Sequence, residues 1–339
     1  MCPSPAAKRH TNQENSMYIV TGGAGFIGSA LVWKLNREGI DDILIVDSLG
    51  TSEKWKNLVK RRYADFIHKD AFYEMLCGGS LPFKAEAVIH MGACSSTTER
   101  DADYLMENNF HYSCALARWA VERKVPFLYA SSGATYGDGS LGFSDDDRVT
   151  PQLRPINMYG YSKQLFDLWV MRNRLLGKVV GIKFFNVFGP NEYHKAEMQS
   201  VVRKSFFQIR DTGKVRLFKS HRAGFGHGEQ IRDFVYVKDC VEVLWWFLQN
   251  PKVRGIFNLG TGKARTWNDL VKAVFKASGV KPKIEYIDMP AEIRDQYQYV
   301  TEAKMDKLRR AGCPVRCRSL EDAVEDYVKG HLQKTDPYL

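Results

Sequence analysis

The chain has 339 residues, of which 44% are hydrophobic and 26% charged, and its formal net charge is +10. This composition is typical of a soluble globular protein, and no apolar run reaches the ~18–20 residues that a membrane-spanning helix needs. The basic residues form no tract with interleaved aromatics, and the seven cysteines lack the spacing of a disulfide framework or a zinc site. We expect a cytoplasmic protein with no nucleic acid, membrane or metal partner.

Residues 1–16 are polar and lack the hydrophobic core of a secretory signal, so we expect a flexible tail. From residue 17 onward, short apolar runs alternate with amphipathic stretches. Strands are expected at 17–21, 43–47, 87–90, 127–131 and 179–185, and helices at 26–37, 112–123 and 161–175. Nearly continuous apolar strands separated by helices predict a doubly wound parallel sheet covered on both faces, a Rossmann-like α/β fold.

The alternation stops after Pro190. The run 192–209 has the pattern of an isolated helix, the loop 219–230 follows, and further helices are expected up to Gln249 and near 267–278, 302–311 and 319–330. We expect a smaller, mostly helical lobe that leans on the first domain. The predicted first domain is 17–187 with returns near 231–258 and 296–301, and the predicted lobe is 188–230, 259–295 and 302–339.

A glycine-rich turn, VTGGAGFIGS, follows the first expected strand and opens the first helix. Its spacing predicts a tight turn, a close approach of backbone to a pyrophosphate, and close packing of helix on strand, from Gly22, Gly25 and Gly28. A helix N-terminus at this place supplies amide donors for phosphate. Placed between a strand and a helix, the motif indicates a dinucleotide site.

Asp47 ends the second expected strand, about 20 residues beyond this turn, as a dinucleotide fingerprint requires. An acid there binds the ribose hydroxyls of NAD and repels a 2′-phosphate. Lys54 and Lys69 lie nearby in the sequence and can neutralise that phosphate. The residues alone leave NAD and NADP open.

The segment MYGYSK places Tyr159 and Lys163 four residues apart at the start of a helix, so they share one face. Tyr161 points elsewhere and is expected to pack. A neighbouring ammonium and a positive nicotinamide ring would both lower the phenol pKa from its ordinary ~10, which suits an acid/base. The run YASSGATYG (129–137) puts a serine after the strand 127–131, where open α/β sheets bind ligands.

A dinucleotide turn, a serine after a later strand and Y-x-x-x-K in this order resemble the extended short-chain dehydrogenase/reductase family, which includes nucleotide-sugar epimerases and dehydratases. The resemblance runs from about Met17 to the final helix. Within that family, GACSSTTE (92–99) and GPNEYHK (189–195) are similar to the ADP-heptose 6-epimerases. This resemblance implies inversion at C6 of an ADP-linked heptose through a 6-ketone, with tightly bound NADP, for lipopolysaccharide core synthesis.

The resemblance also implies residue roles. Ser132, rather than Ser131, would be catalytic with Tyr159 and Lys163, and Lys195 would be a second acid/base. The implied cofactor ligands are Gly22, Gly25, Phe26, Ile27, Gly28, Asp47, Ser48, Lys54, Lys69, Met91, Gly92, Ala93, Cys94, Ser95, Asn108, Lys163, Val187 and Lys195. The implied substrate ligands are Asn186, Glu197, Lys204, Leu217, Phe218, Lys219, Ser220, Arg232 and Tyr297. Members of this family form homo-oligomers, and a pentamer is implied here.

The sequence departs from the family pattern at several of these positions. Ser48 stands where an asparagine is usual and Met91 where a glutamate is frequent, while Glu197 and Lys204 replace a serine and a histidine. The loop 221–231 is also longer than usual. These changes surround the sugar nucleotide rather than the path of the hydride, so reaction type is predicted more firmly than substrate.

Three alternatives remain at this point. A UDP-sugar 4-epimerase would share Ser132, Tyr159 and Lys163 but has no evident need for Lys195. A 4,6-dehydratase needs an acid beside the catalytic hydroxyl residue, whereas glycine and alanine follow Ser132. A non-catalytic dinucleotide-binding protein would typically lack the tyrosine or the lysine, and both are present.

Overall fold

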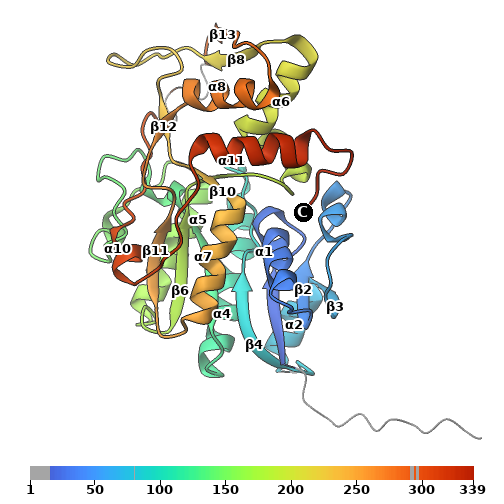
Figure 1. The fold of residues 1–339 in the computed structure, drawn as a ribbon. Coiled ribbons are helices and arrows are strands. Elements are labelled where there is room, and N and C mark those ends of the chain that lie inside the picture. Colours follow the sequence, from blue (N-terminus) through green and yellow to red (C-terminus); the bar gives the residue numbers. More distant parts are fainter. Residues whose placement is uncertain (1–15, 80, 291–293, 295–297) are drawn as a thin grey trace, which may run out of the picture.

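The structure is a computed structural model that describes residues 16–79, 81–290, 294 and 298–339. The tail was expected over residues 1–16; residues 1–15 lie outside the described residues, and Ser16 is the first residue of strand β1. A parallel sheet with helices on both faces forms the larger part, and a smaller lobe lies over one end of it (Figure 1).

Seven parallel strands form the sheet, in the order β11-β6-β5-β4-β1-β2-β3. Their bounds are β1 (Ser16–Thr21), β2 (Ile43–Asp47), β3 (Asp65–His68), β4 (Lys84–His90), β5 (Phe127–Ser132), β6 (Val179–Phe184) and β11 (Gly255–Leu259). Strand order reverses between β1 and β4, and open α/β sheets bind ligands in the crevice at that reversal, outside the carboxyl ends of the strands. The sequence did not predict β3, which carries only two apolar residues.

Helices cover both faces of the sheet, as predicted. One face carries α1 (Phe26–Arg37), α7 (Val237–Gln249) and α10 (Asp306–Arg310), and α1 and α7 lie side by side (Figure 1). The other face carries α2 (Lys69–Cys77), α4 (Tyr112–Glu122) and α5 (Met158–Arg172). The short α3 (Ala102–Leu105) and η2 (Met106–His111), a wide turn of π-helix, lead directly into α4. The doubly wound α/β fold is therefore confirmed.

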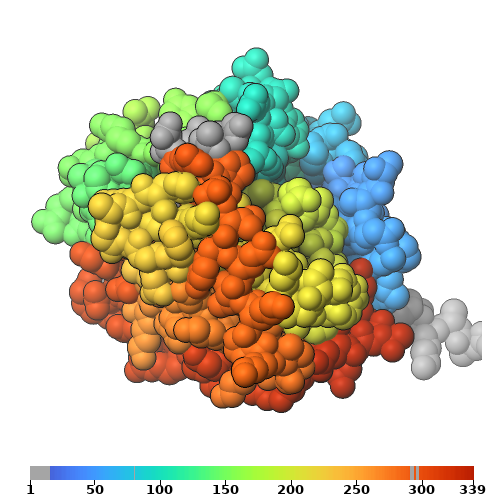
Figure 2. Space-filling model, turned by 90° about the horizontal axis from the view of Figure 1, so that it is seen from above, coloured from blue at the N-terminus to red at the C-terminus, as the bar shows by residue number. Residues whose placement is uncertain are grey.

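The lobe has its own hydrophobic core, which includes Val202, Phe206, Leu270, Val274 and Tyr327. It is built from α6 (Val201–Thr212), α8 (Trp267–Ser278), α11 (Leu320–Tyr327) and the parallel pair β8 (Val215–Phe218) and β13 (Ile284–Ile287). Seen from above, the yellow and orange segments of the lobe cover the centre of the molecule (Figure 2). The lobe therefore covers the carboxyl ends of the strands.

Short elements join the two parts. Two small pairings link them, β7 (Asn186–Phe188) with β10 (Phe234–Tyr236) and β9 (Ile231–Arg232) with β12 (Arg265–Thr266). The remaining short helical segments are η1 (Glu53–Leu58), η3 (Gly133–Tyr136), η4 (Thr150–Gln152) and η6 (Val328–Leu332). Among the described residues, no helix is long and apolar enough to cross a membrane.

The single helix predicted over 192–209 was wrong. A short turn, η5 (Tyr193–Met198), ends in a break, and α6 begins only at Val201. Ser200 caps α6 by accepting a hydrogen bond from the Arg203 amide, and its own hydroxyl donates to Glu192 over 2.6 Å. Ala196 has a φ of +45°, which no helix contains. The chain therefore turns a corner here, and Lys195 lies on that corner.

Candidate active site

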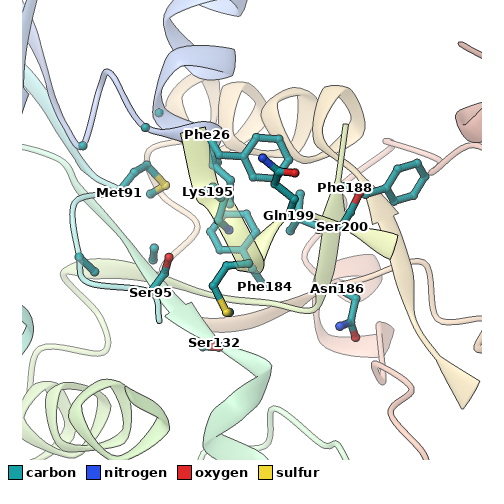
Figure 3. A pocket seen from close by; sticks show the side chains of 18 of the residues that line it. Phe26, Met91, Ser95, Ser132, Phe184, Asn186, Phe188, Lys195, Gln199 and Ser200 are labelled. Atoms are coloured by element: carbon teal, nitrogen blue, oxygen red, sulfur yellow. The ribbon is translucent and has the colours of Figure 1, made fainter. Parts of the chain in front are cut away.

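Two adjoining hollows lie at the carboxyl edge of the sheet, and residues of the lobe also line the larger one. The larger has a volume of about 450 Å³ and the smaller about 240 Å³. Both are lined by Gly22, Asp47, Lys54, Gly92 and Ala93. The labelled side chains that line the larger cavity come from the sheet domain and from the start of the lobe (Figure 3).

Every residue predicted to bind the cofactor lines one of these hollows. Those of the larger cavity are Gly22, Gly25, Phe26, Ile27, Gly28, Asp47, Lys54, Met91, Gly92, Ala93, Ser95, Lys163, Val187 and Lys195. The smaller hollow adds Ser48, Lys69, Cys94 and Asn108. Their individual roles stay predictions.

The glycine turn packs too closely against neighbouring backbone to hold side chains, and it lines the larger cavity at the N-terminus of α1. Gly22 has a φ of +66°, and a Cβ there would lie 2.6 Å from the Gly92 nitrogen; a Cβ on Gly28 would overlap the Gly22 carbonyl oxygen. The first turn of α1 carries no acidic residue, and its N-cap, Gly25, makes no side-chain cap. The amides and dipole of α1 therefore favour an anion, and these residues fit a dinucleotide.

Asp47 and two lysines set the charge of the smaller hollow. One carboxylate oxygen of Asp47 accepts a hydrogen bond from the Ala24 amide over 2.8 Å, and the other binds the Lys54 ammonium over 2.7 Å. Lys69 pairs with the exposed Asp70 over 2.7 Å. Each lysine of this hollow is therefore already paired with an acid, Lys54 with Asp47 and Lys69 with Asp70.

Tyr159 and Lys163 lie one turn apart on α5, and both line the larger cavity. The helix is started by Asn157, whose side chain accepts a hydrogen bond from the Gly160 amide over 2.8 Å. Lys163 is almost completely buried. Tyr161 is 45% exposed, so the expectation that it packs in the interior was wrong. The spacing of four residues thus places Tyr159, rather than Tyr161, on the same face of α5 as Lys163.

The two serines at the end of β5 have different partners. The Ser132 hydroxyl accepts a hydrogen bond from the Ala134 amide over 3.1 Å and is hydrogen-bonded to Tyr159. The Ser131 hydroxyl instead donates to the buried Asp167 over 2.8 Å. Ser132 is therefore the serine that is in contact with the candidate acid/base.

The environment shifts the pKa of both residues on α5. Burial raises the pKa of Tyr159, and the hydrogen bond with Ser132 opposes that shift. Burial lowers the pKa of Lys163 to about 8, and the Asp167 carboxylate opposes that shift. The expectation that the ammonium would lower the phenol pKa needs correction, because in the protein alone burial is the largest cause of the shift and raises the pKa. At neutral pH the protein alone therefore keeps Tyr159 protonated.

Lys195 reaches the cavity from the corner before α6. Its ammonium lies 5.4 Å from the centre of the Phe26 ring, at the start of α1 (Figure 3). Burial lowers the pKa of Lys195, and the charge of Glu192 opposes that shift. The Asn57 amide donates to the carbonyls of Ala24 and Asn191, at 2.9 and 3.1 Å, and so ties this segment to the glycine turn.

Asn109 was missed by the sequence reasoning. It is fully buried in the wide turn η2, accepts a hydrogen bond from the Cys94 amide over 2.8 Å, and donates to the Cys94 carbonyl over 2.9 Å. It also donates to the Ser162 hydroxyl on α5 over 3.1 Å. Asn109 therefore fixes the loop after β4, which carries Cys94, against the helix that carries Tyr159. An asparagine inside an amphipathic helix gives no sequence signal for this role.

Residues of the lobe wall were also missed, because only the fold brings them to the cavity. They are Phe188, Met198, Gln199, Ser200, Val201, Val202, Phe234, Trp267 and Leu270. Of the substrate residues predicted, Asn186 lines the cavity, whereas Glu197 is exposed and pairs with Lys204 at 3.4 Å. Leu217 packs in the lobe core, and Phe218, Lys219, Ser220 and Arg232 line neither hollow. Tyr297 lies outside the described residues, and all nine roles stay predictions.

Comparisons with known proteins agree with this site. Residues 18–260 match the NAD dependent epimerase/dehydratase family. The chain is 62% identical over 323 residues to the ADP-L-glycero-D-manno-heptose-6-epimerase of Nitratidesulfovibrio vulgaris strain DP4, covering 95% of this chain and all of that protein.

Two solved structures are similar to this chain along nearly all of its length. The Helicobacter pylori ADP-L-glycero-D-manno-heptose-6-epimerase superposes with a TM-score of 0.77 at 26% identity, covering 94% of this chain and 96% of that one. The Thermus thermophilus UDP-glucose 4-epimerase in complex with NAD gives 0.72 at 25% identity, over 92% and 98%. The chain therefore belongs to the NAD dependent epimerase/dehydratase family.

Proposed function

We propose that the protein is an ADP-L-glycero-D-manno-heptose 6-epimerase that uses NADP and supplies heptose for lipopolysaccharide core synthesis in the cytoplasm. The observation that carries this proposal is a second lysine, the partly buried Lys195, in the same cavity as Ser132, Tyr159 and Lys163. A relative 62% identical over nearly the whole chain bears this enzyme's name, which supports the choice of substrate.

Inversion at C6 requires that a hydride and a proton leave the carbinol, and that both return with the hydride on the opposite face of the ketone. A dinucleotide held by the glycine turn and the smaller hollow would supply the reversible hydride transfer. Tyr159 exchanges the hydroxyl proton in one sugar orientation, with Ser132 holding the same oxygen. Lys195 exchanges it in the other orientation, and its lowered pKa suits both directions of transfer.

The preference for NADP is proposed from the smaller hollow. Its ribose end carries Lys54 and Lys69 together with one acid, Asp47, which already binds Lys54 over 2.7 Å. A 2′-phosphate would meet both ammonium groups there, whereas both Asp47 oxygens already accept hydrogen bonds, from the Ala24 and Ser48 amides.

A division of the chain is proposed as well. Residues 17–187, with the returns near 231–258 and 296–301, would bind the dinucleotide, and residues 188–230, 259–295 and 302–339 would bind the substrate.

The assembly is proposed to be a pentamer. Light scattering of the purified protein tests this, and a monomeric mass would contradict it.

The decisive experiment offers ADP-D-glycero-D-manno-heptose and UDP-glucose to the purified protein in parallel and follows product stereochemistry by NMR. We expect inversion at C6 of the ADP-sugar and no reaction of the UDP-sugar. Tyr159→Phe is the matched control and should abolish turnover while retaining the cofactor. Inversion at C4 of UDP-glucose would favour the 4-epimerase alternative, and no turnover with either sugar would refute the proposal.

A further inference from the structure

A fully buried ion pair lies directly behind the candidate catalytic residues. Lys183 on β6 donates to Asp167 on α5 over 2.7 Å, and neither side chain has any exposed surface. Removing two charges from water costs energy that their mutual attraction only about recovers, so stability alone is a poor explanation for such a pair. Because the pair lies next to the cavity, its role in the site is the explanation to consider.

The pair is hydrogen-bonded to the strand that carries Ser132. Lys183 also donates to the Thr135 hydroxyl over 2.7 Å, and that hydroxyl donates to the Ser132 carbonyl over 2.8 Å. Asp167 accepts hydrogen bonds from two further hydroxyls of β5, those of Tyr129 and Ser131, at 2.9 and 2.8 Å. The end of β5 is therefore fixed to both charges.

The same pair also belongs to α5. Asp167 follows Lys163 by four residues, and Lys163 follows Tyr159 by four, so the three lie in one stripe along the helix. We propose that the Asp167–Lys183 pair is a positioning unit that holds Ser132 in register with Tyr159 and faces Lys163 with a negative charge. This inference rests on the function proposed for the site.

The groups around Lys163 make the second part of this role specific. Cys94 from the loop after β4 has a raised pKa, and burial lowers the pKa of His90 on β4 to about 3, so both are neutral at pH 7. Tyr159 is protonated as well. The carboxylate of Asp167 then supplies the charge that keeps Lys163 an ammonium against the effect of burial.

The test removes both charges together, in the double variant Asp167→Asn with Lys183→Met, so that neither is left buried alone. We expect kcat for the epimerisation to fall at least tenfold, while KM and the cofactor content of the purified protein stay unchanged. The ¹³C signal of the Lys163 side chain should titrate at a lower pH than in the unchanged protein. The matched control, Lys238→Met with Asp326→Asn, removes a pair with the same 2.7 Å separation outside both hollows and should change neither kcat nor this titration.

A folded double variant with unchanged kcat and an unchanged Lys163 titration would overturn the proposal. If that variant fails to fold, Thr135→Val decides instead, because it cuts only the link from Lys183 to the Ser132 carbonyl. Its kcat should fall with the titration unchanged, and a kcat equal to that of the unchanged protein would overturn the positioning role. If the unchanged protein itself turns over no sugar, the proposed function fails, whereas the Lys163 titration still decides whether Asp167 acts on this lysine.

Discussion

Replacing Lys195 by methionine tests the proposal that two bases serve the two orientations of the sugar. Methionine fills the place of the aliphatic stem beside Phe26 and removes only the ammonium. Glu192 then loses a charge partner but keeps its hydrogen bonds from Ser200 and Tyr327, the latter at 2.9 Å. The fold should therefore survive the exchange.

The expected size of the effect follows from the role. A positioned acid/base contributes about 10²–10⁴ to the rate, or about 3–5.5 kcal/mol of transition-state free energy at ~1.4 kcal/mol for each factor of ten. An exposed lysine that only neutralises charge would contribute about 1 kcal/mol or less. Because the Lys195 ammonium lies 5.4 Å from the centre of the Phe26 ring and its pKa is lowered by burial, we expect the larger range.

The assay separates the two half-reactions by mixing each C6 epimer with enzyme and recording the absorbance of reduced nicotinamide. With Lys195→Met, we expect reduced cofactor from one epimer and none from the other, and with Tyr159→Phe the opposite selectivity. Lys56→Met makes the same exchange at a lysine of η1 outside both hollows and should leave both half-reactions unchanged. Normal turnover in Lys195→Met, or equal loss from both epimers, would refute the assignment of one base to each orientation.

Three further predictions concern the cofactor and stability. Gly28→Ala should release the cofactor, because the added methyl overlaps the Gly22 carbonyl; chromatography of the extracted nucleotide measures its content, and full content would contradict the steric argument. Lys69→Ala should weaken NADP at least tenfold and leave NAD unchanged in titration calorimetry, since one charged hydrogen bond is worth about 1.5–3 kcal/mol; equal weakening of both would place the 2′-phosphate elsewhere. His90 has a pKa of about 3 in the folded protein against an ordinary 6.5. Between these two pH values the unfolded chain therefore binds a proton that the folded chain does not bind. The contribution of neutral His90 to the free energy of unfolding is therefore complete above pH 6.5, and it falls by up to about 5 kcal/mol as the pH is lowered to 3. His90→Gln should flatten the pH dependence of the urea midpoint, and an unchanged slope would exclude His90 as the source of that dependence.

The sequence predicted the parts of the site whose signal is local. A glycine spacing between a strand and a helix, and a tyrosine four residues before a lysine, are statements about one turn of chain, and the fold keeps both. The helix over 192–209 failed because its apolar periodicity hid a helix start at Ser200, which is a preferred N-cap residue and a signal that was available. The wall formed by Trp267 and Phe234 gave no signal, because residues some 30 positions apart meet the cavity only through the packing of the lobe.

The residues that sequence reasoning missed share a physical property. Asn109, Asn57 and Asp167 are polar, almost fully buried, and bonded to segments far away in the chain. A buried polar group is costly unless its partners are fixed, so each one allows a single arrangement of the segments that it joins. Asn109 joins the loop after β4 to α5, Asn57 joins the glycine turn to the Lys195 segment, and Asp167 joins α5 to β5. Since hydride transfer tolerates little misplacement of the reacting groups, rigid joints of this kind are expected where cofactor, acid/base and sugar must meet. Hydrophobic patterning therefore predicts the sheet and its helices, whereas the precision of the site depends on polar residues that such patterning treats as exceptions.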